Sequence, residues 1–312
     1  MSTAISCWSR QKRLSRNLGD GVEGHIIKGY SGFYYVFREG KVYECSLRGK
    51  NRQKKVRFLP GDAVEFSVLD EDKGVIESVL PRKNELIRPP VANIDQVIIT
   101  VAVADPAPDL WLVDRLTILS LWNEITPVIC FNKGDLLSAD KREALTAIYE
   151  QAGFQTLVCS TREGWGIDEL KRLLKGKISV LAGNSGVGKS SLMNTLGGAW
   201  SLATGAVSEK LKRGRHTTRH VELFALDEDT LVADTPGFSS LQLPEDLTRE
   251  TLCKLFPEMM PYLGECRFAT CLHDSEPDCA VKEAVAQGKL SASRYEHYLE
   301  FLKEVIEQER RY

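Results

Sequence analysis

Short apolar runs alternate with glycines and polar turns over residues 22–79. No stretch of this region has the apolar spacing of a long helix. About five strands of this kind suit a small closed barrel of the OB type. We therefore predict an all-β domain over residues 22–84, preceded by a basic arm over residues 1–21. The predicted strands cover residues 25–27, 33–37, 42–45, 56–58, 63–68 and 75–79.

A different pattern begins after residues 81–90, which include Pro89–Pro90 and predict an extended linker. Nearly unbroken apolar runs then alternate with segments of helical spacing. Such runs are typical of parallel sheets covered by helices on both faces, so residues 85–243 are predicted to form a doubly wound α/β domain. The predicted strands are 97–103, 127–131, 156–159, 178–182 and 230–233, and the predicted helices include 110–122, 139–151 and one ending at 170–174.

Residues 244–312 are predicted to form a third, mainly helical domain. A short helix is expected over residues 280–287, and Ser293 with Glu296 offers a capping box for a second helix. The apolar stripe of that second helix is expected to pack inside the protein, and a partner-binding helix is the alternative. The stripe consists of Tyr295, Tyr298, Leu299, Leu302, Val305 and Ile306.

The stretch 183–191, GNSGVGKSS, lies between an apolar strand and a helical segment. In that setting it predicts a phosphate-binding loop, because glycines let backbone N–H groups approach phosphate oxygens and the helix dipole adds attraction. Lys189 is expected to reach the β- and γ-phosphates, and the Ser190 hydroxyl to bind Mg²⁺. An ordinary glycine-rich turn is the alternative. The predicted contacts to nucleotide are Gly183, Asn184, Ser185, Gly186, Val187, Gly188, Lys189, Ser190 and Ser191.

The motif that would select the base is Asn132-Lys133-Gly134-Asp135, at the end of the predicted strand 127–131. The Asp135 carboxylate can accept hydrogen bonds from both N1–H and the exocyclic N2 amine of guanine, a pair that adenine lacks. Asn132 is expected to brace the loop, and the Lys133 stem to lie along the purine. Ser160-Thr161-Arg162 follows the next strand and is expected to contact guanine O6. The pattern predicts GTP rather than ATP.

Asp234-Thr235-Pro236-Gly237 ends the strand 230–233 with a D-x-x-G pattern. Asp234 is expected to hold the magnesium shell through water, and the Gly237 N–H to meet the γ-phosphate. In the preceding segment GRHTTR, a threonine hydroxyl would complete the magnesium shell only when γ-phosphate is present, which would make the segment a switch. We favour Thr218 over Thr217, and the start of a strand before Val221 is the alternative.

The order of these motifs is unusual. Common GTPases have the phosphate loop first, whereas here the guanine-reading motifs precede it. All of the motif-bearing strand ends can still meet at one site, because chain order can be permuted when the original termini lie close together. The sequence therefore predicts a circularly permuted GTPase domain that runs directly into the C-terminal domain.

The C-terminal region contains Cys266-x4-Cys271-x-His273-x5-Cys279. Three thiolates and one imidazole at short spacing predict a closed tetrahedral Zn²⁺ site with a structural role, because four protein ligands leave no open position. Buried free thiols beside a surface histidine are the alternative.

Composition adds a charge asymmetry. The chain of 312 residues has a formal net charge of −2, but residues 1–60 contain thirteen Lys and Arg against four Asp and Glu. A basic end on an acidic body indicates a polyanionic partner, with a solvated basic face as the alternative. Aromatic stacking by residues 33–35 is a weaker RNA candidate, because strand alternation should bury at least one of these rings. The expected RNA contacts are Arg48, Lys50, Arg52, Lys54, Lys55 and Arg57.

Neither a run of about 18 apolar residues nor a signal peptide is evident, so we expect a cytoplasmic protein without membrane contact. Eight cysteines without an export signal argue against a disulfide framework. Nothing in the sequence indicates an obligate oligomer, and we expect a monomer.

Together, the OB-like segment, the permuted motifs with their GRHTT switch and the cysteine cluster resemble the RsgA/YjeQ type of ribosome-assembly GTPase over nearly the whole chain. The resemblance implies hydrolysis of GTP to GDP and phosphate, stimulated by the small ribosomal subunit during its late maturation. It also implies contacts to 16S rRNA from the flanking domains.

Phe238 occupies the position after D-x-x-G where Ras-like enzymes have a glutamine that orients water. Because a phenyl ring cannot hydrogen-bond, intrinsic hydrolysis is expected to be slow. His216 is the candidate for this role, since an imidazole can accept from water near neutral pH, and the resemblance points to the same residue. The alternative is that His216 packs or contacts RNA. The expected catalytic residues are His216, Lys189 and Thr218.

Two other functions compete with this reading. An rRNA-binding or translation module could use the nucleotide only as a slow switch with little turnover, and Phe238 favours that alternative. An ATP-driven RNA remodeller is disfavoured by Asp135.

Overall fold

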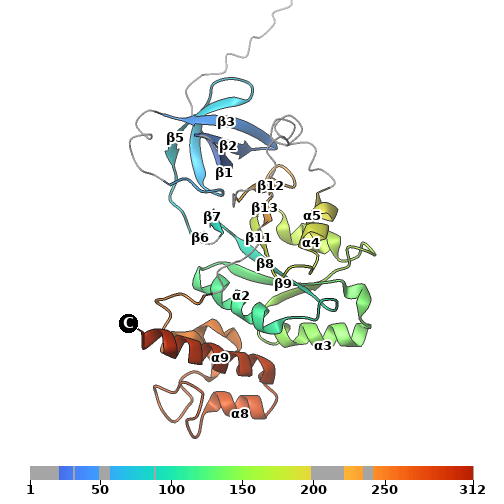
Figure 1. Cartoon of the computed structure of the whole chain (residues 1–312), viewed down its shortest axis with the longest axis vertical. Helices are drawn as coiled ribbons and strands as arrows, with labels where there is room; N and C mark the ends of the chain where they lie inside the picture. Colours follow the sequence, from blue (N-terminus) through green and yellow to red (C-terminus); the bar gives the residue numbers. More distant parts are fainter. Residues whose placement is uncertain are drawn as a thin grey trace, which may run out of the picture.

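The computed structural model describes residues 21–30, 32–48, 57–87, 89–197, 221–234 and 242–311. Within them the chain forms three parts: a β-barrel, a layered α/β domain and a C-terminal group of helices (Figure 1). The barrel and the C-terminal helices lie at opposite ends of the α/β domain.

The N-terminal barrel closes in the strand order β1-β2-β3-β5-β4. All neighbouring strands are antiparallel except β3 and β5, which run parallel. Alternate side chains point inward and form one small core, as expected for a closed sheet, so the predicted OB-type barrel is confirmed. Its strands are Val22–Tyr30, Phe33–Arg38, Lys41–Leu47, Ala63–Val68 and Lys73–Val79, and its core contains Ile26, Val36, Cys45, Val64, Phe66 and Ile76.

One local prediction in this region, the strand at residues 56–58, was wrong. Of the predicted strand 56–58, residue 56 lies outside the described residues, and Arg57 and Phe58 form no strand. The ring centroid of Phe58 instead lies 4.7 Å from that of Tyr34. Phe58 thus covers one of the aromatic rings considered for RNA stacking.

The predicted linker at 81–90 is not simply extended. It contains β6 (Glu85–Ile87), which pairs with β7 (Pro90–Ala92). The Asn93 side chain accepts a hydrogen bond from Lys83 N and donates one to Gly61 O, both at 2.9 Å. These long-range contacts tie the hairpin to the barrel, which a local pattern of prolines does not reveal.

The central sheet has six strands in the order β10-β9-β8-β11-β13-β12, all parallel except β12. Every residue of β8 (Gln96–Ala102) is buried, because helices cover both faces. Val97, Ile99 and Val101 join one core with α2 and α3, whereas Ile98 joins the other with α4 and α5. The remaining elements are α2 (Leu110–Trp122), β9 (Thr126–Asn132), η1 (Gly134–Leu136), α3 (Ala139–Glu150), β10 (Gln155–Val158), α4 (Ile167–Leu174), β11 (Ile178–Ala182), α5 (Lys189–Leu196), β12 (Leu223–Ala225) and β13 (Leu231–Asp234).

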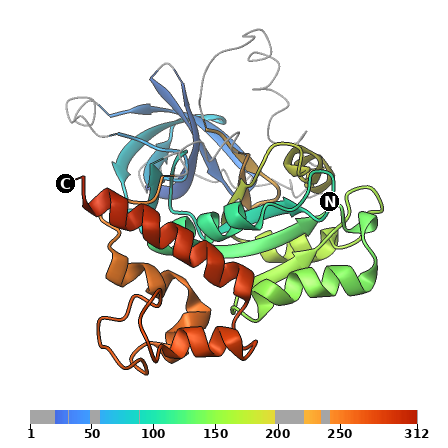
Figure 2. The same cartoon turned by 60° about the horizontal axis from the view of Figure 1, so that its bottom comes forward.

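The C-terminal part has a separate core, to which Ile118 of α2 also contributes. Helix α9 packs along α2, as Figure 2 shows. Its N-cap is Ser291, whose hydroxyl accepts from Arg294 N, so the predicted cap at Ser293 was two residues late. The elements are α7 (Arg249–Leu252), η2 (Cys253–Leu255), η3 (Pro257–Tyr262), α8 (Ala280–Ala286) and α9 (Ala292–Glu309).

Buried charges join α2 to α9. Arg294 is 1% exposed and contacts the carboxylates of Asp114 and Glu258, and its guanidinium lies 5.2 Å from the Phe256 ring centroid. Arg115 donates to both carboxylate oxygens of Glu304, at 2.7 and 2.6 Å. A buried guanidinium needs such partners, since an unpaired charge is costly in the interior. These ion pairs therefore fix how α9 lies against α2, and we call this contact between the two helices the seam.

None of the helices among the described residues is long and apolar enough to span a membrane.

Candidate functional site

The predicted nucleotide-binding motifs that fall within the described residues lie at the carboxyl ends of neighbouring strands. The loops after β8 and β11 meet at the point where the chain reverses its direction of progress through the sheet. Open α/β sheets bind ligands at such a switch point. The motif Asn132–Asp135 follows β9, next to β8, and Ser160-Thr161 follows β10.

The phosphate loop leads from β11 into α5. Its Gly188 has φ 98°, a left-handed conformation that favours glycine, and α5 begins at the next residue. Lys189 Nζ donates to the carbonyls of Gly183 and Asn184, at 2.8 and 2.7 Å. Ser185 and Gly186 are exposed at the tip, whereas Val187 is buried. Ser190 and Ser191 lie in the first turn of α5, so the loop presents its backbone at a helix N-terminus.

Asn132 connects the base-reading turn to the phosphate loop. Its buried Nδ2 donates to Val187 O at 2.9 Å, and its Oδ1 lies 3.5 Å from Cys159 Sγ. A Cβ on Gly188 would lie only 2.2 Å from the same nitrogen. The close approach of these two loops therefore requires a glycine at 188.

Asp135 is held by the neighbouring loop. Ser160 Oγ donates to Asp135 Oδ1 at 2.6 Å, and Gly134 N donates to Cys159 O at 2.9 Å. The Ser160 hydrogen bond, assisted by the charges of Arg162 and Lys133, lowers the pKa of Asp135. The carboxylate is thus ionised and acceptor-only at neutral pH. Thr161 directly follows Ser160 in this loop and is half-buried.

Two contacts from the loop after β8 were not anticipated. Asp109 Oδ1 caps α2 by accepting from Leu112 N at 3.0 Å, and Asp109 Oδ2 accepts from Asn184 Nδ2 at 2.9 Å. Lys133, which has φ 60°, donates through Nζ to Asp105 O. An aspartate just before a helical run signals an N-cap, but its second contact depends on the sheet order.

Several predicted residues lie wholly or partly outside the described residues. His216, Thr217, Thr218, Gly237 and Phe238 are among them. The backbone of Asp234 ends β13 and pairs with Leu181 of β11, which brings it beside the start of the phosphate loop.

Of the six basic residues predicted to contact RNA, Lys50, Arg52, Lys54 and Lys55 also lie outside the described residues. Arg48 forms an ion pair with Glu77 and its side chain is 66% exposed, and Arg57 is exposed.

The four predicted metal ligands come together in the C-terminal part. Their donor atoms all lie within 4.8 Å of one another. His273 Nδ1 is 3.5 Å from Cys266 Sγ and 3.4 Å from Cys279 Sγ, and the latter two sulfurs are 3.9 Å apart. A tetrahedron with Zn–S bonds of about 2.3 Å has edges of about 3.8 Å, so Cys266, Cys271, His273 and Cys279 fit one metal ion.

Helix α9 supports this metal-ligand cluster. Tyr295 Oη donates to His273 O and Tyr298 Oη to Leu272 O, both at 2.7 Å. The Glu276 carboxylate accepts from Leu272 N and Asp274 N, at 2.8 and 3.0 Å. Burial raises the pKa of Cys271 to about 12, which means that its thiolate needs a compensating cation.

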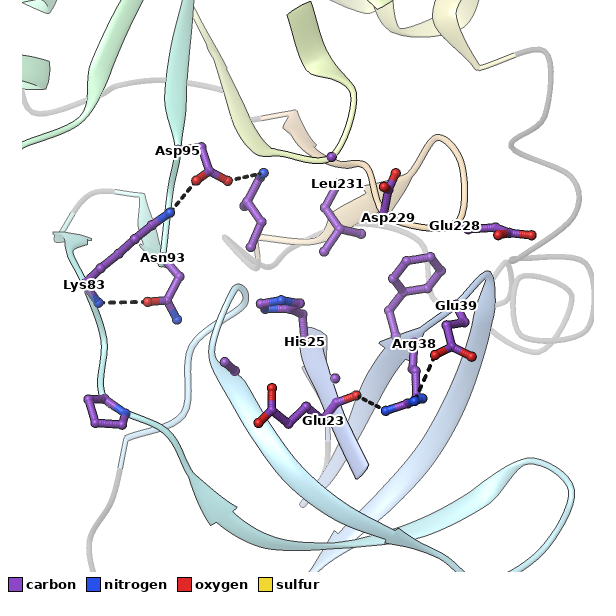
Figure 3. Close-up of a pocket in the computed structure, with 16 residues that line it drawn as sticks. Glu23, His25, Arg38, Glu39, Lys83, Asn93, Asp95, Glu228, Asp229 and Leu231 are labelled. Carbon is purple, nitrogen blue, oxygen red and sulfur yellow. Dashed lines mark hydrogen bonds and ion pairs between the residues drawn. The ribbon is translucent and has the colours of Figure 1, made fainter. Parts of the chain in front are cut away.

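A cavity of about 650 Å³ lies elsewhere, between the barrel and the α/β domain (Figure 3). Its lining includes Asp95, Ile178 and Leu231, which precede or begin β8, β11 and β13. It therefore lies at the amino ends of the parallel strands, away from the phosphate loop. Carboxylates such as Glu23 and Asp229 line it, and phosphate groups would meet repulsion there.

Comparisons with known proteins agree with this arrangement. The family model described as RsgA GTPase matches residues 79–244, and that described as RsgA N-terminal domain matches residues 23–76. A relative from Moorella thermoacetica named small ribosomal subunit biogenesis GTPase RsgA is 51% identical over 93% of this chain and 99% of its own length. A relative of the same name from Agathobacter rectalis is 45% identical over 89% of this chain and 96% of its own length.

Solved structures show the same similarity. YjeQ from Thermotoga maritima matches with a TM-score of 0.75 and 38% identity, covering 91% of this chain and 98% of YjeQ. YloQ, described as a circularly permuted GTPase, matches with a TM-score of 0.74 and 37% identity, covering 94% and 97% of the two chains. The order of the motifs in this chain and the contact between its loops at one sheet edge agree with these similarities. The similarities show that the chain belongs to the RsgA GTPase family.

Proposed function

We propose that this chain hydrolyses GTP to GDP and phosphate in the late maturation of the small ribosomal subunit, and that the subunit stimulates turnover. The observation that carries the proposal is the Asn132–Val187 hydrogen bond, which joins the base-reading turn to the phosphate loop. The curated relatives, named as small ribosomal subunit biogenesis GTPases over nearly their full length, support the ribosomal role.

Guanine recognition is assigned to Asp135. Its ionised carboxylate would accept from guanine N1–H and the N2 amine, while Ser160 holds the other side of the carboxylate. An adenine base offers no such pair of donors, so the carboxylate would keep its hydrogen bond from Ser160 but gain none from the base. Lys133 lies beside this carboxylate and would cover one face of the purine.

Phosphate binding is assigned to the loop from Gly183 to Ser191. The Lys189 ammonium would exchange its two carbonyl partners for oxygens of the β- and γ-phosphates, and exposed backbone N–H groups at the loop tip would approach the same anion. Ser190 and Asp234 are proposed to hold Mg²⁺, which neutralises charge between the phosphates. Thr217 or Thr218 and the Gly237 N–H are proposed to complete contacts to the metal and the γ-phosphate.

His216 is proposed to orient the attacking water, because Phe238 cannot do so. The His216→Ala variant is expected to lower subunit-stimulated turnover while GTP affinity stays nearly constant. A fall in affinity with unchanged turnover of the bound nucleotide would contradict this role.

The metal of the C-terminal cluster is proposed to be Zn²⁺, since three thiols and one imidazole in tetrahedral spacing match its preferences. Contacts to 16S rRNA are proposed for the basic segment from Arg48 to Arg57 and for the metal-binding domain. A structural ion would let this small domain keep a defined surface toward RNA.

The central experiment measures turnover of GTP and ATP with and without purified small subunits. Stimulation with GTP alone supports the proposal, and stimulation with ATP contradicts it. The Asp135→Asn variant is expected to prefer xanthosine triphosphate, because an amide can donate to the oxygen that replaces the guanine N2 amine. Asp168→Asn, at an exposed site on α4, is the matched control.

The slow-switch module is the second candidate function, and Phe238 is the observation that favours it. Tight GTP binding without stimulation by the subunit would select that function.

A further inference from the structure

We propose that Arg142 and Trp165 form a clamp that positions Asp135, and thereby set the selectivity of this site for guanine. Neither residue belongs to the predicted nucleotide motifs. This inference rests on the guanine-binding role proposed above for Asp135 and adds the residues that would act through it.

The first half of the clamp is the guanidinium of Arg142 in α3. Its Nη1 donates to Gly134 O at 2.8 Å and to Leu137 O at 2.6 Å. These carbonyls begin and follow the 3-10 turn that carries Asp135. Because charge-assisted hydrogen bonds are stronger than neutral ones, Arg142 restrains the turn from both sides of Asp135.

The second half is the Trp165 ring. It lies against Gly134 so closely that a Cβ on this glycine would be 2.4 Å from Trp165 Cη2. Gly134 does not have a positive φ, so the glycine is needed here for space rather than for backbone conformation. The Arg142 guanidinium also lies 5.2 Å from the Trp165 ring centroid, in cation–π range.

Trp165 also closes the loop that holds the carboxylate. Its carbonyl accepts from Ser160 N at 3.0 Å, and Gly164 N donates to Ser160 O at 2.8 Å. Ser160 Oγ in turn donates to Asp135. The Trp165 ring therefore contacts Gly134 directly, whereas the Trp165 backbone carbonyl orients Asp135 through Ser160.

The consequence is geometric selectivity. The bidentate pair between a carboxylate and guanine needs both oxygens in the plane of the base, and a small rotation loses one hydrogen bond. Phosphate contacts lie on a different loop and do not require this alignment. Loosening the clamp should therefore reduce discrimination between bases without a matching loss of phosphate affinity.

The test measures the affinities of the full chain for GDP, IDP and ADP by calorimetry. Inosine lacks the N2 amine, so the GDP-to-IDP affinity ratio reports the pairing with Asp135. In R142Q and W165A this ratio is expected to fall by about tenfold, because the charge-assisted hydrogen bond from the guanine N2 amine to the Asp135 carboxylate is misaligned. The IDP affinity should change less than about twofold, and W165F should recover most of the ratio because a ring still covers Gly134.

The control R172Q, on the exposed surface of α4, should leave all three affinities unchanged. An unchanged ratio in both R142Q and W165A, or an equal loss of GDP and IDP affinity, would overturn the clamp while leaving the proposed function intact. Absence of guanine preference in the unmodified chain would instead overturn the assignment of Asp135, and the clamp with it.

Discussion

Gly188 and Asn132 approach each other so closely that a Cβ on the glycine would lie 2.2 Å from the asparagine side-chain nitrogen. The two residues belong to different loops, and their contact joins the turn after β9 to the phosphate loop after β11. The glycine is thus needed twice, for space and for its φ of 98°.

The first prediction follows from this contact. Gly188→Ala should lower GDP affinity at least about tenfold, because the methyl group both strains a left-handed backbone and displaces Asn132. Calorimetric titration of the variant with GDP measures the effect. Gly153→Ala is the matched control, since Gly153 has φ 84° but nothing within 4 Å of its added Cβ. Equal affinity losses in the two variants would show that the contact with Asn132 is unimportant.

The second prediction concerns pH. The Ser160 hydrogen bond lowers the pKa of Asp135, so the guanine-binding carboxylate persists to lower pH and is lost as pH falls through that pKa. In Ser160→Ala the pKa of Asp135 should rise, and the acid loss of GDP affinity should begin at a higher pH. Titrations of GDP affinity between about pH 6 and pH 3, a range that includes the ordinary aspartate pKa and lower values, measure this.

Ser138→Ala is the control for this shift, because Ser138 is exposed and makes no side-chain capping bond to α3. If GDP affinity falls over the same pH range in Ser160→Ala and in the unmodified chain, the coupling between the two loops is contradicted.

The third prediction concerns the seam between α2 and α9. Arg294→Met should destabilise this seam by about 3–5 kcal/mol, because it removes the cation that Asp114 and Glu258 share. The change leaves Glu258 without that cation and Asp114 paired with the His297 imidazole. Urea unfolding and amide hydrogen exchange of α9 measure the loss. Arg162→Met, which breaks an exposed ion pair with Glu163, should change stability by less than about 1 kcal/mol. If Arg294→Met is equally harmless, the buried pairs do not hold the domains together.

The fourth prediction concerns the metal-ligand cluster. Cys271→Ser should abolish metal binding and speed hydrogen exchange in the C-terminal helices, because the remaining donors no longer close a tetrahedron. Elemental analysis is expected to find about one zinc ion per molecule of the unmodified chain. Cys253→Ser, a buried thiol of the same core outside the cluster, should keep its metal. Retention of zinc by Cys271→Ser would remove that residue from the ligand set.

Local patterns were sufficient for most of the secondary structure. The helix 110–122 and the strand 178–182 were predicted with their observed bounds, because their apolar periodicity and flanking turns are local properties. The hairpin within residues 81–92 was missed, since its stability comes from Asn93 and its contacts with Gly61 and Lys83. The cap of α9 was misplaced because two nearby serines carry the same local signal.

The sequence by itself determined the kinds of chemistry available, because a phosphate loop, a guanine-reading turn and a thiol–imidazole set each need particular residue types at short, fixed spacing. Only the tertiary structure decided which of these groups touch. Val187 meets Asn132 across 55 residues and Arg294 meets Asp114 across 180, through strand order and helix packing. Such contacts depend on how whole elements pack, and local periodicity carries no information about partners so distant in the chain.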